Sequence, residues 1–175
     1  MISFENIEEY TTSKKIIQIH RCIGVSPLLC VPLAIGKDIL LIQYLHDFHL
    51  EGYKVIRLKD ISKVVRDSGD EFVEGIFKKE GIYEQIRMPN IKMQDNMIDM
   101  LKEIQKKNIN FILDCDETNN ETMYIGRILE ISEKLLFETF DTLGKWEEDL
   151  LEINYDDITA LSYNEYNEVY SKYLI

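Results

Sequence analysis

Short runs of apolar residues, separated by polar turns, dominate the chain. Within most runs apolar and polar residues alternate, which is the pattern of β-strands with one buried face. The run from Leu28 to Ile35 is almost continuously apolar, which is typical of a strand buried on both faces. The pattern predicts ten strands in two groups of five: Lys14–Arg21, Leu28–Ile35, Ile39–Leu45, Tyr53–Leu58 and Ile61–Val65, then Phe111–Cys115, Tyr124–Ile131, Leu135–Phe140, Leu150–Tyr155 and Ile158–Tyr163.

One segment repeats its apolar residues at helical spacing. From Met93 to Lys107 these residues recur every three or four positions, and charged residues occupy the other faces. We therefore predict an amphipathic helix here that packs on the strands, although its methionines would also suit a surface that binds a partner. Shorter helices or turns are expected in the first dozen residues and after each strand group, at Asp70–Phe77 and Glu165–Leu174.

The two strand groups repeat one pattern. A segment of thirty residues in the first group aligns without a gap with the second group, at a constant offset of 95. The offset then becomes 97, because the second group has two additional residues in the polar turn around Gly144, where an insertion costs little. A constant offset over such a span indicates an internal duplication. The aligned positions include Ile16 with Phe111, Leu40 with Leu135, Leu45 with Phe140, Asp60 with Asp157 and Ile61 with Ile158.

The strand lengths and turns favour a particular fold class. Five short strands joined by short polar turns are more typical of a small closed β-barrel than of a layered α/β fold. The expected fold is therefore mainly β with short α-helices, in which two duplicated five-stranded small β-barrels are joined by the amphipathic helix. We expect the first unit in residues 1–83, the linker and helix in 84–107, and the second unit in 108–175. Units of this size are near the lower limit for an independent core, so the two should pack together.

A helix followed by five short strands, present in both halves, resembles the Sm-like small β-barrel, a relative of the Src-homology-3-like barrels. The closest local match is the Asp-Ile pair at the last strand of each unit. This resemblance implies an RNA-binding regulator, yet the turns Asp47–Gly52 and Asp141–Glu148 lack the basic-and-Asn signature of the family's RNA contacts. No RNA-binding residue therefore carries over to this chain. The acidic tandem arrangement is more similar to two-barrel bacterial proteins.

Composition indicates a folded cytoplasmic protein. The 175 residues are 45% hydrophobic with only three prolines, as expected of a globular chain. The acidic N-terminal segment is unlike a secretory signal, and no stretch is apolar enough to span a membrane. Three cysteines at irregular spacing suggest free thiols in a reducing compartment.

The residues of a metal site are present in the first unit, but not at the usual spacing. His20, Cys22, Cys30, His46 and His49 supply imidazole and thiol groups, and no pair has Cys-x-x-Cys spacing. We interpret them as core and surface residues and expect neither a metal nor another cofactor. Phosphate-binding loops and nucleophile motifs are also missing from the sequence. We do not expect an enzyme, and an unrecognised hydrolase or metal-binding protein is kept as an alternative.

The charge of the chain is concentrated in the second unit. Residues 1–83 hold 11 basic and 12 acidic residues, and residues 84–107 hold 5 and 4, whereas residues 108–175 hold 4 and 16. The second unit therefore accounts for the whole net charge of −12. Affinity for nucleic acid comes largely from Lys and Arg, so this unit is a poor candidate for binding it. The alternative, an Sm-like RNA-binding regulator, would use the first unit and its basic residues Lys14, Lys15, Lys54, Arg57 and Arg66.

The acidic second unit suggests a basic protein partner. The leading hypothesis is a non-catalytic protein-interaction module, such as an immunity-like or antitoxin-like inhibitor of a cationic nuclease. Its partner-binding residues would be Trp146, Glu147, Glu148 and Asp149, which are consecutive in the lengthened turn. They combine an aromatic anchor with surrounding charge, as interfaces often do. The competing interpretation is that the acidity only maintains solubility.

Overall fold

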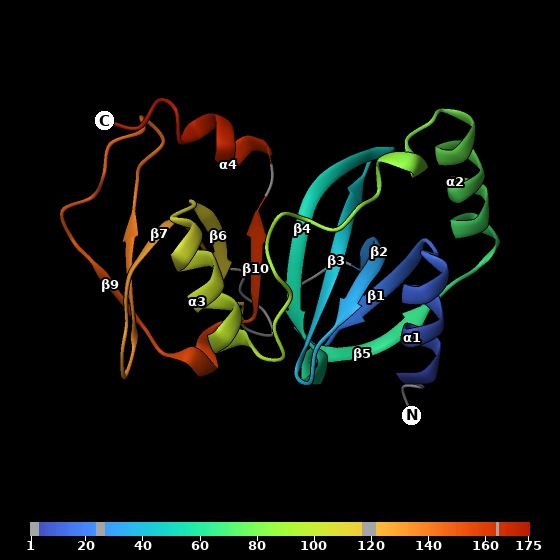
Figure 1. Ribbon diagram of the computed structural model, residues 1–175, viewed down its shortest axis with the longest axis horizontal. Coiled ribbons are helices and arrows are strands. Elements are labelled where there is room, and N and C mark those ends of the chain that lie inside the picture. The colour runs from blue at the N-terminus through green and yellow to red at the C-terminus, as the bar shows by residue number, and fades with distance from the viewer. Residues whose placement is uncertain (1–3, 24–26, 117–121, 164) are drawn as a thin grey trace.

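The computed structural model describes residues 4–23, 27–116, 122–163 and 165–175 (Figure 1). Within these ranges, ten strands form one antiparallel sheet, in the order β5-β1-β2-β3-β4-β10-β6-β7-β8-β9. The protein is therefore mainly β, as the alternating pattern predicted. The strands are β1 Ile17–Arg21, β2 Leu28–Ile35, β3 Ile39–His46, β4 His49–Arg57, β5 Ile61–Val65, β6 Phe111–Asp114, β7 Met123–Ile131, β8 Leu135–Thr139, β9 Leu151–Ile153 and β10 Ala160–Tyr163.

Four α-helices and three short 3-10 helices accompany the sheet in the described part of the chain. The predicted amphipathic helix is confirmed but begins four residues later than expected, because the side chain of Asn96 accepts a hydrogen bond from Asp99 N and caps it there. It ends at Asn108, whose left-handed backbone stops the helix. The helices are α1 Phe4–Ser13, α2 Ser68–Lys79, α3 Met97–Lys107 and α4 Glu165–Tyr170, with η1 Leu58–Asp60, η2 Tyr83–Gln85 and η3 Tyr155–Asp157.

The strand order of the first half recurs in the second. The sequence β5-β1-β2-β3-β4 is followed across the sheet by β10-β6-β7-β8-β9. The register follows the predicted offsets where the third and fourth strands of each half meet: Leu40 pairs with Ile56, and Leu135 pairs with Ile153. The second strand of each half also contains a register shift, and α1 contacts β2 as α3 contacts β7. The two halves thus share order, register and helix placement.

The expectation of two separate closed barrels is wrong, because the sheet is continuous and is not closed. The outer side of β4 does not return to β5 but pairs with β10 of the other half. This pairing places apolar residues opposite each other, with Val55 facing Leu161, and stacks the rings of Tyr53 and Tyr163 at 5.4 Å. Joining the halves here buries two strand edges that separate units would expose.

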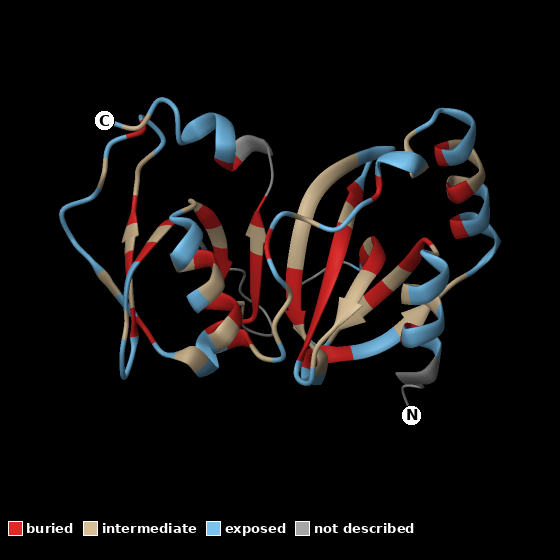
Figure 2. Cartoon of the chain, viewed as in Figure 1, coloured by how far each residue is buried: buried red, intermediate tan, exposed pale blue. Residues whose placement is uncertain are grey.

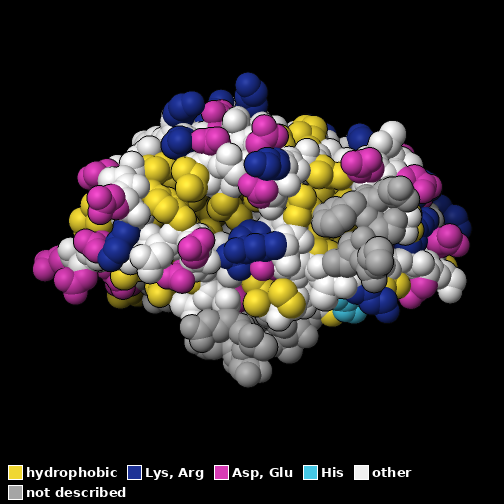
Figure 3. Space-filling view, turned by 90° about the horizontal axis from the view of Figure 1, so that it is seen from below, with side chains coloured by type: hydrophobic (Ala, Val, Ile, Leu, Met, Phe, Trp, Pro, Cys, Tyr) yellow, Lys and Arg dark blue, Asp and Glu magenta, His cyan; other side chains and the backbone are white. Residues whose placement is uncertain are grey.

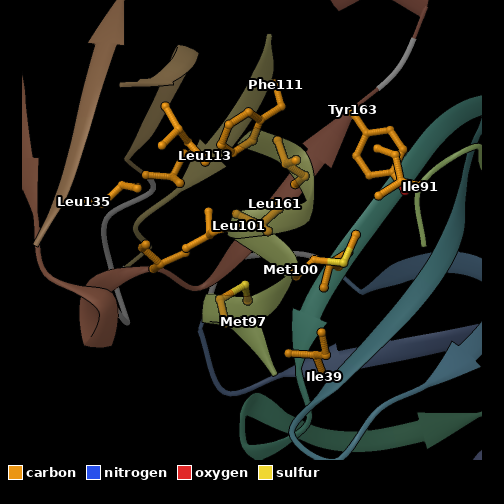
Figure 4. Packing of buried hydrophobic residues seen from close by; sticks show 14 of the residues in the cluster. Ile39, Ile91, Met97, Met100, Leu101, Phe111, Leu113, Leu135, Leu161 and Tyr163 are labelled. Atoms are coloured by element: carbon orange, nitrogen blue, oxygen red, sulfur yellow. The ribbon is translucent and has the colours of Figure 1, made fainter. Parts of the chain in front are cut away.

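The largest hydrophobic cluster spans the junction of the halves (Figure 4). The buried face of α3, including Met100 and Leu101, packs between Ile39 on β3 and residues of the second half such as Leu113. Figure 2 shows the same distribution, with buried residues concentrated in α3 and the central strands. This apolar stripe is core, and its methionines are not a surface for a partner. Because one cluster draws on both halves, we expect them to unfold together.

The first half has two further clusters, one on each face of its strands. Ile7 of α1 packs with Leu40 and Ile56 on one face. Phe77 of α2 packs with Val31 and Leu45 on the other. None of the helices in the described ranges is long and apolar enough to cross a membrane.

Candidate functional site

The lengthened turn between β8 and β9 is held by its own polar groups and by the end of the chain. The carboxylate of Asp141 accepts hydrogen bonds from the backbone N–H groups of Leu143 and Lys145. Gly144 takes a positive φ of 77°, a conformation in which other residues would be strained. Its carbonyl accepts from the backbone N–H of Ile175 at 2.8 Å. These hydrogen bonds therefore give the turn a defined conformation.

Trp146 contributes to this structure. Its half-buried indole lies 4.2 Å from the guanidinium carbon of Arg127, in a cation–π contact. The edge of the ring meets Phe140 at 5.5 Å, and Phe140 also stacks on Tyr170 of α4. The predicted aromatic anchor thus packs against Arg127 of β7 and against Phe140, and is only partly available to a partner.

The three carboxylates after Trp146 are exposed, as their position in a polar turn suggested. Glu147 accepts a hydrogen bond from the hydroxyl of Thr139, which ties the start of the segment to β8. In the part of the chain that the structure describes, Glu148 and Asp149 form no salt bridge. A fourth carboxylate, Glu152 on β9, is exposed and lies 3.0 Å from Lys134.

These residues follow the outer edge of the sheet, which we call the acidic edge (residues 147–152). Among the described residues, β9 pairs only with β8, so its other side is open. Leu150 within this edge is 43% exposed. Figure 3 shows Asp and Glu side chains gathered at the β9 end of the molecule, on its left side. Open backbone groups, carboxylates and an exposed apolar side chain therefore coincide at one edge.

A pocket of about 510 Å³ lies beside the turn. Trp146 and Arg127 form part of its wall, and the remainder comes from the loop after α3, from α4 and from the residues that follow α4. Sequence reasoning missed this pocket because its residues are far apart in the chain. Its polar lining includes Asn108, Asn110, Asn167, Glu168 and Ser171.

At the junction of the halves, basic residues of the first half meet acidic residues of the second. Arg21 Nη2 lies 3.2 Å from Asp116 Oδ2, and Lys54 Nζ lies 2.6 Å from Asp114 Oδ2. These four side chains are between 6% and 17% exposed. Part of the acidic excess of the second half therefore neutralises buried cations of the first half.

Most other basic residues suggested for RNA binding are also paired within the protein. Arg57 pairs with Asp60 and Arg66 pairs with Glu74. Lys15 lies 3.4 Å from the same Glu74 carboxylate. These internal ion pairs reduce the charge available for a phosphate backbone.

Glu74 on α2 is a buried carboxylate at the centre of a cluster of charges. Burial alone would raise its pKa, but a hydrogen bond from Lys78 Nζ and the charges of Arg66 and Lys15 outweigh burial. The pKa of Glu74 therefore lies below its ordinary value of 4.5. The cluster holds α2 against the start of β1, because the same carboxylate also accepts a hydrogen bond from the backbone N–H of Ile16, the residue before that strand.

A groove of about 680 Å³ crosses the lower face of the molecule at the junction. Its wall includes the exposed side chains of Lys37, Lys59 and Lys102, together with Arg57 and the start of α3. Figure 3 shows Lys and Arg side chains near the middle of this face, with apolar atoms on either side. Three acidic residues, Asp38, Asp99 and Asp156, share the wall and offset its charge.

The histidine and cysteine residues of the first half occupy different parts of the fold. His46 and His49 face each other across the turn between β3 and β4, whereas His20 is on β1. Cys30 is buried in β2, and Cys22 is exposed at the end of β1. The described residues contain no group of three or more His, Cys, Asp or Glu placed to hold a metal ion.

The acidic edge is the site that combines most features of a binding surface. It has a strand with one open side among the described residues, exposed carboxylates and an adjacent pocket. The junction groove is a second concave surface, with mixed charge. Comparison with models of protein families, with curated proteins and with solved structures finds no match to this chain.

Proposed function

We propose that this chain is an internally duplicated, non-catalytic interaction protein that binds a basic protein segment along its acidic edge. The observation that carries the proposal is the open side of β9, with exposed carboxylates at Glu148, Asp149 and Glu152. The duplication is supported by the repeated strand order and by the equal register of Leu40 and Leu135. An inhibitor of a cationic nuclease, of the immunity or antitoxin type, is one protein that would use such an edge.

The edge favours binding by strand addition. An extended segment laid along β9 would satisfy the backbone groups that point away from β8. Lysine or arginine side chains at alternate positions would meet the carboxylates, which would mainly accelerate association and select basic partners. Leu150 would provide an apolar contact within this charged surface.

Trp146 has two roles in this proposal. Its contacts with Arg127 and Phe140 hold the turn in place. Its remaining surface lines the pocket, where it would contact a side chain of the partner. Replacing Trp146 with Ala should therefore weaken binding by about 2 kcal/mol, mainly through faster dissociation. Urea unfolding of the same variant would measure the part of this effect that comes from the turn itself.

The direct test is titration with a synthetic peptide of alternating Lys and Val, followed by calorimetry at low and at physiological salt. The neutralised variant Glu148→Gln/Asp149→Asn/Glu152→Gln should bind about tenfold more weakly, and added salt should weaken binding to the wild type. Glu8→Gln/Glu9→Gln, which neutralises two exposed carboxylates on α1, is the control and should bind normally.

A peptide with N-methyl groups at alternate residues keeps its charge but cannot extend the sheet. It should not bind if strand addition is the mode. Equal affinity of the wild type and the neutralised variant, or equal affinity of the two peptides, would overturn the proposal.

The junction groove favours a second candidate, an RNA-binding regulator. Lys37 and Lys59 are exposed in its wall and form no ion pair within the described residues. Single-stranded RNA would be bound through these charges, with Tyr155 available on the same wall. Lys37→Glu/Lys59→Glu should then abolish retention of oligouridine, with Lys79→Glu as control. Failure of the wild type to bind oligouridine at low salt would exclude this candidate.

A further inference from the structure

The two ends of the sheet are complementary to each other. Within the described residues, β5 pairs only with β1, and β9 pairs only with β8, so each end strand has one open side. Because the strand order repeats, β5 is the fifth strand of the first half and β9 is the fourth strand of the second. The junction inside the chain already joins a fourth strand, β4, to a fifth strand, β10. We propose that β5 of a second copy of this chain is the basic segment, and that it pairs antiparallel with β9 of the first copy. This inference rests on the proposed function, since both use the acidic edge.

The internal junction defines the register of this contact. Ala160 pairs with both Ile56 and Asp114 at the junction. In the first half Val64 takes the position of Ala160, because Val64 pairs with Ile19, which aligns with Asp114. The offset is 96 here and not 97, because the pairing of β1 with β5 shifts register between His20 and Arg21. The position of Ile56 in the second half is taken by Ile153. Val64 of one copy therefore lies opposite Ile153 of the next.

This register matches the burial and charge of the two strands. Val64 packs against the core of the first half, and Ile153 belongs to the core of the second, so apolar residues meet on the inner side. On the outer side Val65 lies opposite Glu152. Lys63 is two residues from Val65, and cross-strand neighbours at this diagonal spacing are within reach of long side chains. Exposed Lys63 therefore meets exposed Glu152.

The sign of the charges distinguishes this contact from the internal junction. At the junction the fourth-strand side carries the cation Lys54, and the anion Asp114 lies across β10. At the outer contact the fourth strand is acidic and the fifth strand carries Lys63, with Lys59 just before it. Both contacts are complementary, but they are not interchangeable, which would keep the copies in one head-to-tail order.

Sedimentation velocity over a range of protein concentrations tests the contact. The wild type should exceed the monomer mass of 20.7 kDa as its concentration rises, and added salt should reverse the effect. Lys63→Glu and Glu152→Lys should each weaken association about tenfold, and the double variant Lys63→Glu/Glu152→Lys should restore it. The matched single-charge controls, Lys79→Glu on α2 and Glu9→Lys on α1, should associate like the wild type.

A wild type that remains monomeric at every concentration, or a double variant that stays dissociated, would overturn the inference. The peptide titration, repeated on Lys63→Glu, separates this failure from failure of the proposed function, because this variant keeps its acidic edge free. Peptide binding by a chain that never self-associates would leave the proposed function in place and remove only the second copy as partner. Self-association without peptide binding would support the contact between copies, and would contradict the proposal that the acidic edge binds a basic segment of another protein.

Discussion

Breaking the ion pair between Lys54 and Asp114 should be far more costly than replacing it. Lys54 lies on β4 and Asp114 on β6, so the pair reaches across β10 and connects the two halves of the sheet. The distance of 2.6 Å and exposures of 17% and 9% describe a largely desolvated pair. Lys54→Met leaves the Asp114 carboxylate buried without its cation, and such losses cost about 3–5 kcal/mol.

The double variant Lys54→Met/Asp114→Leu removes both charges. It should recover most of that loss and lie within about 1.5 kcal/mol of the wild type, because apolar pairs of similar volume replace buried ion pairs well. Urea unfolding followed by far-UV circular dichroism gives the free energy of unfolding of each variant at neutral pH. The shared core predicts a single transition in every case.

The measured coupling decides the matter. Losses that simply add, so that the double variant is as unstable as the sum of Lys54→Met and Asp114→Leu, would show that the two side chains do not interact. A loss below about 0.5 kcal/mol for Lys54→Met would show that the pair is solvated, as surface ion pairs are.

Three further predictions concern the fold. Gly126→Ala should cost at least about 3 kcal/mol in urea unfolding, because a Cβ there would lie 1.9 Å from a backbone oxygen of β8. The control Gly75→Ala, in open space on α2, should instead stabilise the protein by about 0.5–1 kcal/mol. Equal effects of the two substitutions would refute the packing argument. The lowered pKa of Glu74 contributes stability that is present above pH 4.5 and is lost as the pH falls through the folded-state pKa. Glu74→Gln should therefore reduce the pH dependence of the free energy of unfolding over this range. An unchanged pH dependence would exclude the Glu74 cluster as its cause. Burial raises the pKa of Cys30, so a disulfide reagent should modify exposed Cys22 quickly and Cys30 only at the rate of unfolding. Rapid modification of both Cys22 and Cys30 would contradict the burial of Cys30.

Strand positions could be predicted from the sequence because they depend on local alternation. The segments Leu28–Ile35 and Ile61–Val65 were predicted with the bounds that β2 and β5 have. The offset of 95 changing to 97 also predicted which residues pair, since Leu135 meets Ile153 as Leu40 meets Ile56. The strand bounds depend on residues that are close together in the chain, and the pairing follows from a spacing that can be measured along the sequence.

Closure of the sheet could not be predicted in this way. The fourth strand, β4, would need the same alternation of apolar and polar residues whether it paired with β5 of its own half or with β10 of the other half. The choice depends on contacts such as Val55 with Leu161, whose residues are distant in sequence. For the same reason the exposure of Glu148 could be expected from its polar turn, but not the contact of Trp146 with Arg127.

The position of β10 bears on how the chain is made. Of the ten strands in the described part of the chain, β10 is the last to be synthesised, yet it lies in the interior of the sheet between β4 and β6. During translation the edges of β4 and β6 that pair with β10 therefore remain unpaired until residues 160–163 leave the ribosome. The contact between β4 and β10 joins residues about a hundred positions apart, and such long-range pairing is slow to form. Nascent chains on crowded polysomes would present unpaired edges to each other in that interval, so chaperones that cover strand edges should affect its yield more than its final stability.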